Sequence, residues 1–288
     1  MFMVRANPFK LILVAVSCSF FSCQYSNANT PENVVAAERM EIIEKLTDTV
    51  KKTVRNNVQE ILAKKEIPIL CYHHIRDYLP SDQASAKPYI VPVNVFEQQM
   101  KALKDSGYQS IVIEDLMNYL EFNQPLPEKA VMITFDDTNL NQYTNGLPLL
   151  DKYGFKGVFF MMTVPIGKER FMSKAQIKAL ADAGHDVQLH TWDHKNVKKF
   201  EEKDWDIQIT RAAKTLENIT GKPVVHFAFP FGLWSPDVLP KLEKLGMKSA
   251  YQLADKRDSQ YPLYSIRRII VPGTLSGKTL VGQMKKSF

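Results

Sequence analysis

The chain has 288 residues, of which 45% are apolar and 24% are charged. This composition is sufficient for one substantial hydrophobic core and excludes a disordered or fibrous protein. The formal net charge of +6 arises from Lys and Arg residues that are scattered among Asp and Glu, which gives no support to nucleic-acid binding. We therefore expect one domain of catalytic size that acts as a monomer.

Residues 1–22 have the pattern of a secretory signal peptide. A basic start precedes a short apolar run, Leu11–Val16, which is too short to span a bilayer as a helix. Cleavage before Cys23 would resemble a bacterial lipoprotein signal and make this cysteine the lipidated first residue, whereas residues 26–28 offer a site for another signal peptidase. The pattern predicts export from a bacterial cytoplasm to the cell envelope, with lipid on Cys23 as the means of membrane attachment.

Residues 31–66 form a charged leader with a helical pattern. Apolar residues recur at steps of three or four, at Ile43, Leu46, Val50, Val54, Val58 and Ile61. This spacing predicts an amphipathic helix, which either packs on the domain or acts as a stalk. Cys71, in the apolar run that follows, is predicted to be a buried core thiol, and no disulfide framework is available.

From residue 67 to residue 288, strand and helix patterns alternate. Predicted helices include one beginning at Asn94 and one beginning at Ser173, each with a capping residue three positions on. The predicted strands are 67–72, 108–113, 130–135, 157–162, 186–190, 224–229, 249–253 and 265–271. Repeated strand and helix indicate a parallel sheet. We expect an α/β fold, a distorted (β/α) barrel of about seven parallel strands.

Reactive side chains follow several of these strands. Asp136 and Asp137 end an apolar strand, His190 ends another with His194 four residues later, and His73 follows a third. An Asp pair at a strand end more often makes a turn or a cap. In a parallel barrel, however, the carboxyl ends meet at one rim, where catalytic residues converge. Two His and one Asp there suit a divalent metal with open positions for water and substrate.

Two of these stretches resemble motifs of a known family. TFDD, which ends at Asp137, and HTWDH, residues 190–194, are similar to the first two motifs of the polysaccharide deacetylases, carbohydrate esterase family 4 with the NodB-homology domain. The resemblance covers roughly residues 67–272. It implies that Asp136 is the general base and that Asp137, His190 and His194 bind a divalent metal, with Zn expected and Co, Ni, Fe or Mn as alternatives.

Three further stretches resemble the branch that contains poly-N-acetylglucosamine deacetylases. They are YHHI at residues 72–75, FAFPFG at 227–232 and RRIIV at 267–271. In that branch the general-acid histidine comes first in the chain, which implies His73 as the acid and His74 as a bystander. Two departures stand out: Thr138 replaces the usual glycine after the Asp pair, and the third-motif arginine is missing, with Phe229 near its place. The partner of Asp136 is therefore unidentified from the sequence.

The chemistry that these residues would support is hydrolysis of an acetamide on a polysaccharide. Asp136 would accept a proton from a metal-activated water, the N–H of Phe231 would face the oxyanion, and protonated His73 would donate to the leaving amine. Trp192, Trp234 and Phe231 are candidate sugar platforms, although large aromatic side chains more often pack in a core. An O-acetyl esterase on xylan or another acetylated glycan, and a non-catalytic glycan-binding protein, are the alternatives. Adjacent carboxylates fit a glycoside hydrolase less well.

Overall fold

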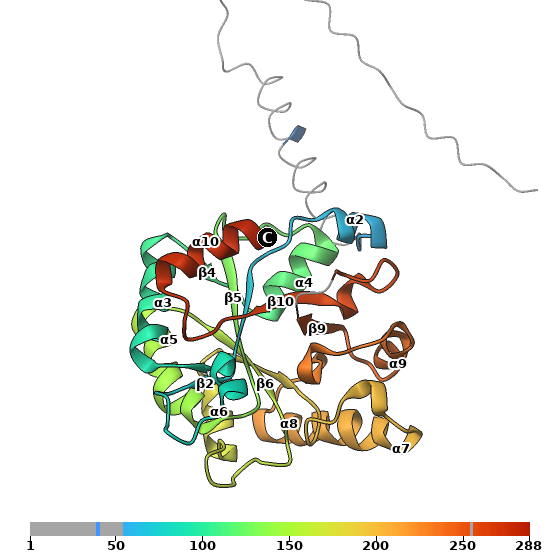
Figure 1. The fold of residues 1–288 in the computed structure, drawn as a ribbon. Helices are drawn as coiled ribbons and strands as arrows, with labels where there is room; N and C mark the ends of the chain where they lie inside the picture. The colour runs from blue at the N-terminus through green and yellow to red at the C-terminus, as the bar shows by residue number, and fades with distance from the viewer. Residues whose placement is uncertain (1–38, 41–53, 254–255) are drawn as a thin grey trace, which may run out of the picture. The chain divides into compact units, whose positions relative to one another are not determined.

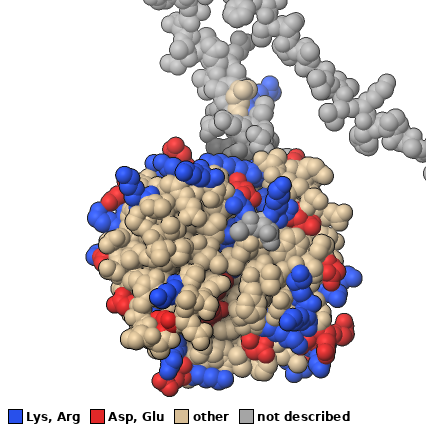
Figure 2. Space-filling view, in the orientation of Figure 1, with Lys and Arg blue, Asp and Glu red and all other residues tan. Residues whose placement is uncertain are grey.

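The computed structural model describes residues 39–40 and 54–288, apart from residues 254 and 255 (Figure 1). The predicted signal peptide at 1–22 and the candidate lipidation site Cys23 lie outside the described residues. Among the helices that are described, none has the length and apolar character needed to cross a membrane. On the face shown in Figure 2, acidic and basic side chains are interspersed.

Seven parallel strands close into a barrel. Their order is β1, β10, β9, β8, β7, β6 and β5, and pairing of β1 with β5 completes the ring. The strands are β1 (Ile69–Tyr72), β5 (Ala130–Asp136), β6 (Gly157–Met161), β7 (Asp186–Leu189), β8 (His226–Ala228), β9 (Ser249–Leu253) and β10 (Ile266–Ile270). The short β4 (Gln109–Ser110) pairs with the start of β5, while β2 (His74–Ile75) pairs with β3 (Ile90–Val91). The prediction of a (β/α) barrel of about seven parallel strands is confirmed.

Helices surround the strands (Figure 1). They are α2 (Val58–Ala63), α3 (Val93–Asp105), α4 (Ile113–Phe122), α5 (Leu147–Tyr153), α6 (Lys174–Asp182), α7 (Glu202–Asp204), α8 (Ala212–Thr220), α9 (Leu239–Lys244) and α10 (Gly277–Ser287). The predicted cap at Ser173 is confirmed, because its side chain accepts a hydrogen bond from the Gln176 N–H and begins α6. Gly154 ends α5 with φ of 71°, a left-handed conformation that suits glycine.

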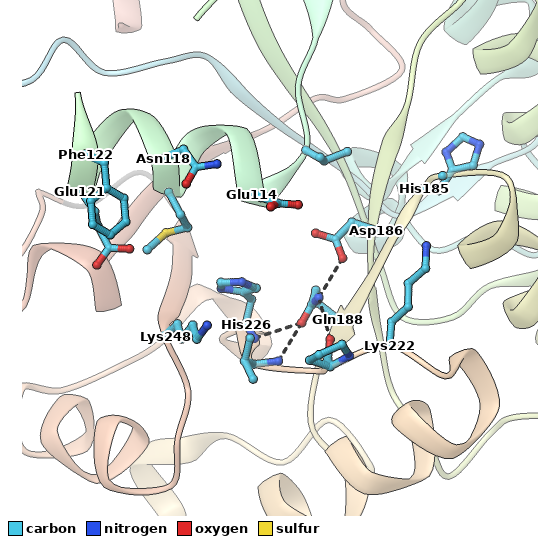
Figure 3. Close-up of a pocket in the computed structure, with 15 residues that line it drawn as sticks. Glu114, Asn118, Glu121, Phe122, His185, Asp186, Gln188, Lys222, His226 and Lys248 are labelled. Atoms are coloured by element: carbon cyan, nitrogen blue, oxygen red, sulfur yellow. Dashed lines mark hydrogen bonds between the residues drawn. The ribbon is translucent and has the colours of Figure 1, made fainter. Parts of the chain in front are cut away.

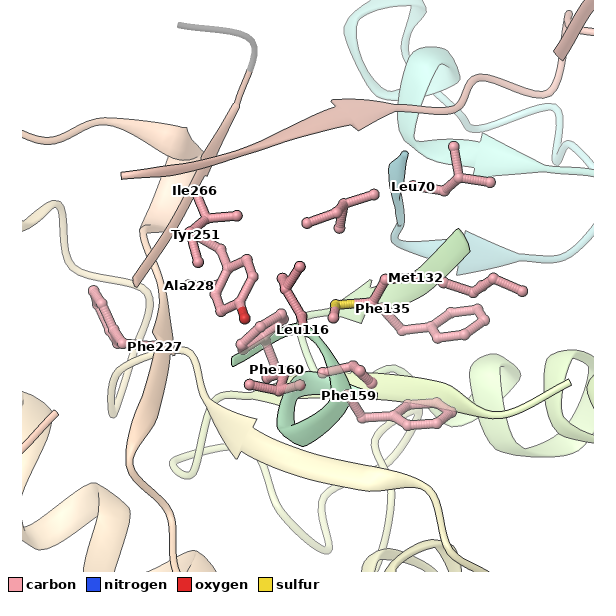
Figure 4. Close-up of a cluster of buried hydrophobic side chains, with 14 of the residues drawn as sticks. Leu70, Leu116, Met132, Phe135, Phe159, Phe160, Phe227, Ala228, Tyr251 and Ile266 are labelled. Carbon is pink, nitrogen blue, oxygen red and sulfur yellow. The ribbon is translucent and has the colours of Figure 1, made fainter. Parts of the chain in front are cut away.

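The core fills both the barrel interior and the layer between strands and helices (Figure 4). All seven residues of β5 are buried, and the side chains of a strand alternate between its two faces. Phe135 stacks on the ring of Phe159 at 4.7 Å and also contacts Phe96 of α3, so it faces the helices. Its neighbours Thr134 and Asp136 consequently face the barrel interior. The alternation of an otherwise largely apolar strand thereby places the Asp136 carboxylate in the barrel interior.

Two local predictions differ from the structure. The run expected as a strand at 108–113 pairs only at Gln109–Ser110, and α4 begins at Ile113. The helix expected from Asn94 begins instead at Val93, after Pro92, whose fixed φ suits the entry to a helix.

The predicted leader helix at 31–66 is not confirmed. Most of it lies outside the described residues, and the described backbone at residues 54–57 is not helical. A new helix, α2, starts after Asn57, because the Asn57 side chain accepts from the Glu60 N–H and the Glu60 side chain accepts from the Asn57 N–H.

Candidate active site

The carboxyl ends of the barrel strands surround a cavity of about 300 Å³. Its lining comes from the ends of five barrel strands and includes His73, Asp136, Asp137, His194 and Phe231. Asp136 is the last residue of β5, His73 follows β1, and His190 follows β7. The rim predicted from the sequence therefore exists and brings these distant side chains together.

Asp137, His190 and His194 form a cluster with the composition of a metal site. The Asp137 Oδ1 atom lies 3.4 Å from the Nε2 atoms of both histidines, and the ligand atoms all lie within 4.8 Å of one another. Within the described part of the chain, Asp137 Oδ1 and His190 Nε2 are buried without a hydrogen-bond partner. Buried polar atoms are normally satisfied, so a cation bound between these three side chains would explain both unpaired atoms.

The backbone around His190 fixes the orientation of its ring. Its Nδ1 lies 2.8 Å from the Ala228 carbonyl oxygen, which can only accept, so Nδ1 carries a proton and Nε2 is the atom presented to the cluster. The Thr191 side chain accepts a hydrogen bond from the His194 N–H at 2.9 Å. This turn explains how two histidines four residues apart reach one point without lying on a helix.

The charges in the cluster favour a cation. Burial alone would raise the pKa of Asp137, but the neighbouring His190 and the charge of His73 hold this pKa well below its usual range. Burial alone would lower the pKa of His190, but Asp136 and Asp137 raise it. Burial and the neighbouring His190 lower the pKa of His194 to about 4. The ionised Asp137 and the neutral His194 are in the state that binds a metal, and the carboxylates that raise the pKa of His190 supply negative charge that a bound cation would neutralise in place of a proton.

Asp136 has a different partner from its neighbour. Arg268, on β10 and fully buried, donates from Nη1 to Asp136 Oδ1 at 2.7 Å and from Nη2 to Oδ2 at 2.8 Å. Burial alone would raise the pKa of Asp136, but the Arg268 charge lowers it. The ion pair thus keeps Asp136 ionised and fixes its plane. Arg268 supplies the partner of Asp136 that the missing third-motif arginine left unidentified.

The sequence did contain a signal for Arg268. Arg267 and Arg268 are adjacent on one strand, and alternation places their side chains on opposite faces. Arg267 pairs with Glu66 outside the barrel at 2.5 Å. One of two adjacent arginines in a barrel strand must therefore face the interior, where it needs a buried carboxylate as partner.

His73 lies beside Asp136 and is about nine-tenths buried. The Cys71 thiol lies 3.6 Å from Asp136 Oδ2 and 4.0 Å from His73 Nδ1, so the predicted core thiol is buried but also borders the site. Burial lowers the pKa of His73, while the charges of Asp137 and Asp136 oppose this shift. His74 lines the same cavity, with its Nδ1 3.1 Å from Asn141 Nδ2.

The rim contains unusual backbone conformations. Among the described residues, seven non-glycine residues have a positive φ, and five of these lie at the rim: Asp137, Thr138, Thr191, His194 and Phe231. Such conformations are strained and concentrate at functional sites. Thr138 itself adopts the left-handed conformation that glycine would take, with φ of 64°. Its hydroxyl donates to the Met162 carbonyl oxygen at 2.9 Å, which stabilises the turn.

The three candidate aromatic platforms occupy different positions. Phe231 is 59% exposed, lines the cavity and packs its ring 4.4 Å from that of His194. The hydrogen bonds of its turn are donated by Gly232 and Leu233, so they do not use the Phe231 N–H. Trp192 is 40% exposed and Trp234 packs against the core, and neither lines the cavity.

A larger hollow, of about 560 Å³, lies at the opposite end of the barrel (Figure 3). There Gln188 accepts from the N–H groups of Val225 and His226 and donates to Asp186 at 2.8 Å. Its polar groups are thus engaged in joining β7 to β8. We place the candidate active site at the smaller cavity, because that is where strained backbone and unpaired ligand atoms coincide.

The chain is similar to known proteins of one family. Residues 123–250 match the model of the polysaccharide deacetylase family. One relative is the Bacillus subtilis (strain 168) protein YxkH, which is provisionally named as a polysaccharide deacetylase. The two chains are 27% identical over 274 residues, which are 93% of this chain and 95% of that protein. It is 28% identical over 209 residues to the poly-beta-1,6-N-acetyl-D-glucosamine N-deacetylase of Staphylococcus aureus (strain MRSA252), covering 65% and 72% of the two chains.

Two solved structures are similar in fold and sequence. The Streptococcus pyogenes deacetylase PplD, in complex with acetate, superposes with a TM-score of 0.70 at 25% identity, covering 76% of this chain and 98% of that chain. IcaB from Ammonifex degensii superposes with a TM-score of 0.64 at 26% identity, covering 77% and 98%.

Proposed function

Because this chain belongs to the polysaccharide deacetylase family, we propose that it removes acetyl groups from an N-acetylglucosamine polymer by metal-dependent hydrolysis. The observation that carries the proposal is the contrast between two adjacent carboxylates. Asp137 faces two histidines with one oxygen unpaired, whereas Asp136 is held by Arg268. One carboxylate is thus arranged to bind a cation and the other to accept a proton.

Asp137, His190 and His194 would hold the metal. Two imidazole nitrogens and one carboxylate oxygen suit Zn²⁺ in a catalytic site, and Co, Ni, Fe or Mn could be held by the same ligands. The bound ion would lower the pKa of a water and polarise the acyl carbonyl.

Asp136 is the proposed general base. Its carboxylate lines the cavity beside Asp137 and stays ionised at neutral pH because Arg268 lowers its pKa. It would take one proton from the attacking water while Arg268 keeps its position fixed. The N–H of Phe231, which the turn hydrogen bonds leave out, would face the oxyanion that forms on the acyl oxygen.

His73 is the proposed general acid. An amide nitrogen cannot depart as an anion, so the C–N bond breaks only as a proton reaches the nitrogen. The lowered pKa of His73 makes its protonated form a stronger donor. The products would be acetate and a free amino group on the sugar, and Phe231 would contact a sugar ring at the mouth.

The polymer is proposed from the relatives. The Staphylococcus aureus relative is named for poly-beta-1,6-linked N-acetylglucosamine. Trp192, exposed beside the rim, is a candidate contact for distant sugars of the chain. From the basic start and the short apolar run of residues 1–22, we propose that this segment directs export and that Cys23 carries a lipid that anchors the protein at the envelope.

Acetate release tests the proposal directly. Purified protein, loaded with Zn²⁺, would be incubated with β-1,6-linked N-acetylglucosamine oligomers, chitooligosaccharides, peptidoglycan and acetylxylan, each with and without a chelator. We expect acetate from the β-1,6-linked oligomers, and its loss with chelator. Release from acetylxylan alone would show an O-acetyl esterase, and release from none with metal bound would show a glycan-binding protein.

A further inference from the structure

Residues 139–145 follow the two Asp residues and carry four amide side chains. We call this stretch the amide turn. All four of its amide side chains form hydrogen bonds with the backbone of residues 73–75. The contacts come from Asn139 Nδ2 to the His73 carbonyl oxygen at 3.4 Å, Gln142 Nε2 to the same oxygen at 2.7 Å, the Ile75 N–H to Asn141 Oδ1 at 2.8 Å and Asn145 Nδ2 to the Ile75 carbonyl oxygen at 2.8 Å.

Gln142 is the member that reaches both proposed catalytic residues. Its Nε2 donates to the carbonyl oxygen of His73 and to the carbonyl oxygen of Asp136. Both acceptors are carbonyls, which cannot donate, so the NH₂ group must face them and both of its N–H bonds are used. The Gln142 side chain is fully buried, and the residue is the first of a π-helical turn, Gln142–Gly146. π-helical turns often mark functional positions.

Gln142 acts at the point where the strand ladder ends. The register of β1 and β5 runs from Ile69 opposite Met132 to Tyr72 opposite Phe135, and goes no further. One residue later the two chains separate: His74 pairs with β3, and Asp137 takes a φ of 79°. His73 and Asp136 are the first residues beyond the paired part of β1 and β5. The Gln142 amide donates to both of their carbonyl oxygens and so links the two backbones where strand pairing has ended.

We propose that Gln142 is a positioning residue that sets the separation of the acid His73 from the base Asp136 and the metal ligand beside it. This inference rests on the proposed function. A purely structural role fits less well, because Gln142 Oε1 is buried without a partner in the described part of the chain. An unsatisfied buried acceptor is destabilising, and an apolar residue of similar size would avoid this cost. The geometry that Gln142 imposes on the site explains why that cost is tolerated.

The test compares Gln142→Leu with Gln188→Leu. Gln188 is also buried and also joins two strands, β7 and β8, but at the opposite end of the barrel. For each variant, kcat and KM would be measured on an N-acetylglucosamine oligomer and on nitrophenyl acetate, whose leaving group needs no proton. Bound metal and thermal unfolding would be measured alongside.

We expect Gln142→Leu to bind metal as the wild type does and to lose kcat on the N-acetyl substrate on the order of 10-fold to 100-fold, as for a misplaced catalytic group. Its kcat on the activated ester should fall much less, and Gln188→Leu should alter stability without changing the ratio of the two rates. An unchanged ratio in Gln142→Leu would overturn the inference. If that variant does not fold, the same ratio is measured in Gln142→Asn, which keeps the amide but is one methylene shorter.

The two proposals fail in different ways. A wild-type protein that binds metal but releases no acetate from any N-acetyl substrate refutes the proposed function. A wild type that is active, with Gln142 variants in which both rates fall equally or neither falls, refutes only the positioning role.

Discussion

The two ends of the barrel use the same kinds of residue in opposite ways. At the amino end, Gln188 satisfies both of its amide groups and Asp186 has a hydrogen-bond partner. At the carboxyl end, Asp137 Oδ1 and His190 Nε2 are buried without partners in the described structure. The larger hollow is at the amino end, about 560 Å³ against about 300 Å³. Among the described residues, His185 Nε2 at the amino end is also buried without a hydrogen-bond partner, so what identifies the site is the coincidence of several unpaired ligand atoms with strained backbone, and not volume.

The largest expected effect distinguishes the roles of the adjacent carboxylates, Asp136 and Asp137. Asp137→Ala and His190→Ala should lose bound metal, whereas Asp136→Asn should keep it and lose turnover by about 10²- to 10⁴-fold, as for a lost general base. Metal analysis of the purified variants and acetate release would show this. Asp186→Asn, at the amino end, is the matched control and should keep both metal and turnover.

An empty metal site in Asp136→Asn, or full activity of that variant, would show that the roles of the two carboxylates are wrongly assigned. A normal rate for Asp137→Ala with no metal bound would remove the metal from the mechanism altogether.

The second prediction concerns the buried ion pair. Arg268→Met leaves Asp136 buried without its main counter-charge, so the pKa of Asp136 should rise because the largest effect that opposes burial is removed. Removing one partner of a buried pair destabilises a protein by about 3–5 kcal/mol. Denaturant unfolding of Arg268→Met would measure the loss. The adjacent Arg267→Met, whose side chain faces Glu66 outside the barrel, should be destabilised much less; equal losses would contradict the interior pairing.

His73 provides the third comparison, between the proposed acid and its neighbour. His73→Ala should keep metal and fold, and should slow hydrolysis of N-acetyl substrates on the order of 10²-fold or more. Nitrophenyl acetate should be affected much less, because its leaving group departs without a proton. His74→Ala should change little. If both substrates slow equally in His73→Ala, the residue is structural, and a larger loss in His74→Ala would identify His74 as the acid.

The smallest expected effect lies at the amino end and concerns stability alone. Burial and the Lys248 charge lower the pKa of His226 from 6.5 to about 3. Below pH 6.5 His226 is protonated in the unfolded chain, whereas in the folded chain it stays neutral down to about pH 3. Stability therefore falls as the pH falls from 6.5 to 3. The slope is at most about 1.4 kcal/mol per pH unit for one group. His226→Gln should flatten the dependence of unfolding free energy on pH between 3 and 6.5.

An unchanged slope in His226→Gln would mean that His226 is protonated in the folded state, contrary to its burial. Turnover at neutral pH should be the same in this variant, since the rim does not depend on it.

The sequence by itself determined the barrel and the reactive residues at its rim. Apolar strand runs that end in Asp136, His190 or His73 can be recognised locally, because parallel strands gather their carboxyl ends at one edge whatever their order. The cap at Ser173 could also be predicted, because its partner Gln176 is only three residues away in the sequence. By contrast, the period of the leader did not predict that Asn57 caps a helix, α2, within it.

Only the tertiary structure decided which groups pair. Arg268 is 132 residues from Asp136 along the chain, and Gln142 is 69 residues from His73. A local pattern indicates that one of Arg267 and Arg268 faces the interior, but it does not identify the partner, because the pairing depends on the closure of β1 against β5. Trp234 shows the same limit, since its residue type suits a sugar platform and only packing places it against the core. Residue type gives a side chain its chemistry, and the fold gives it a partner.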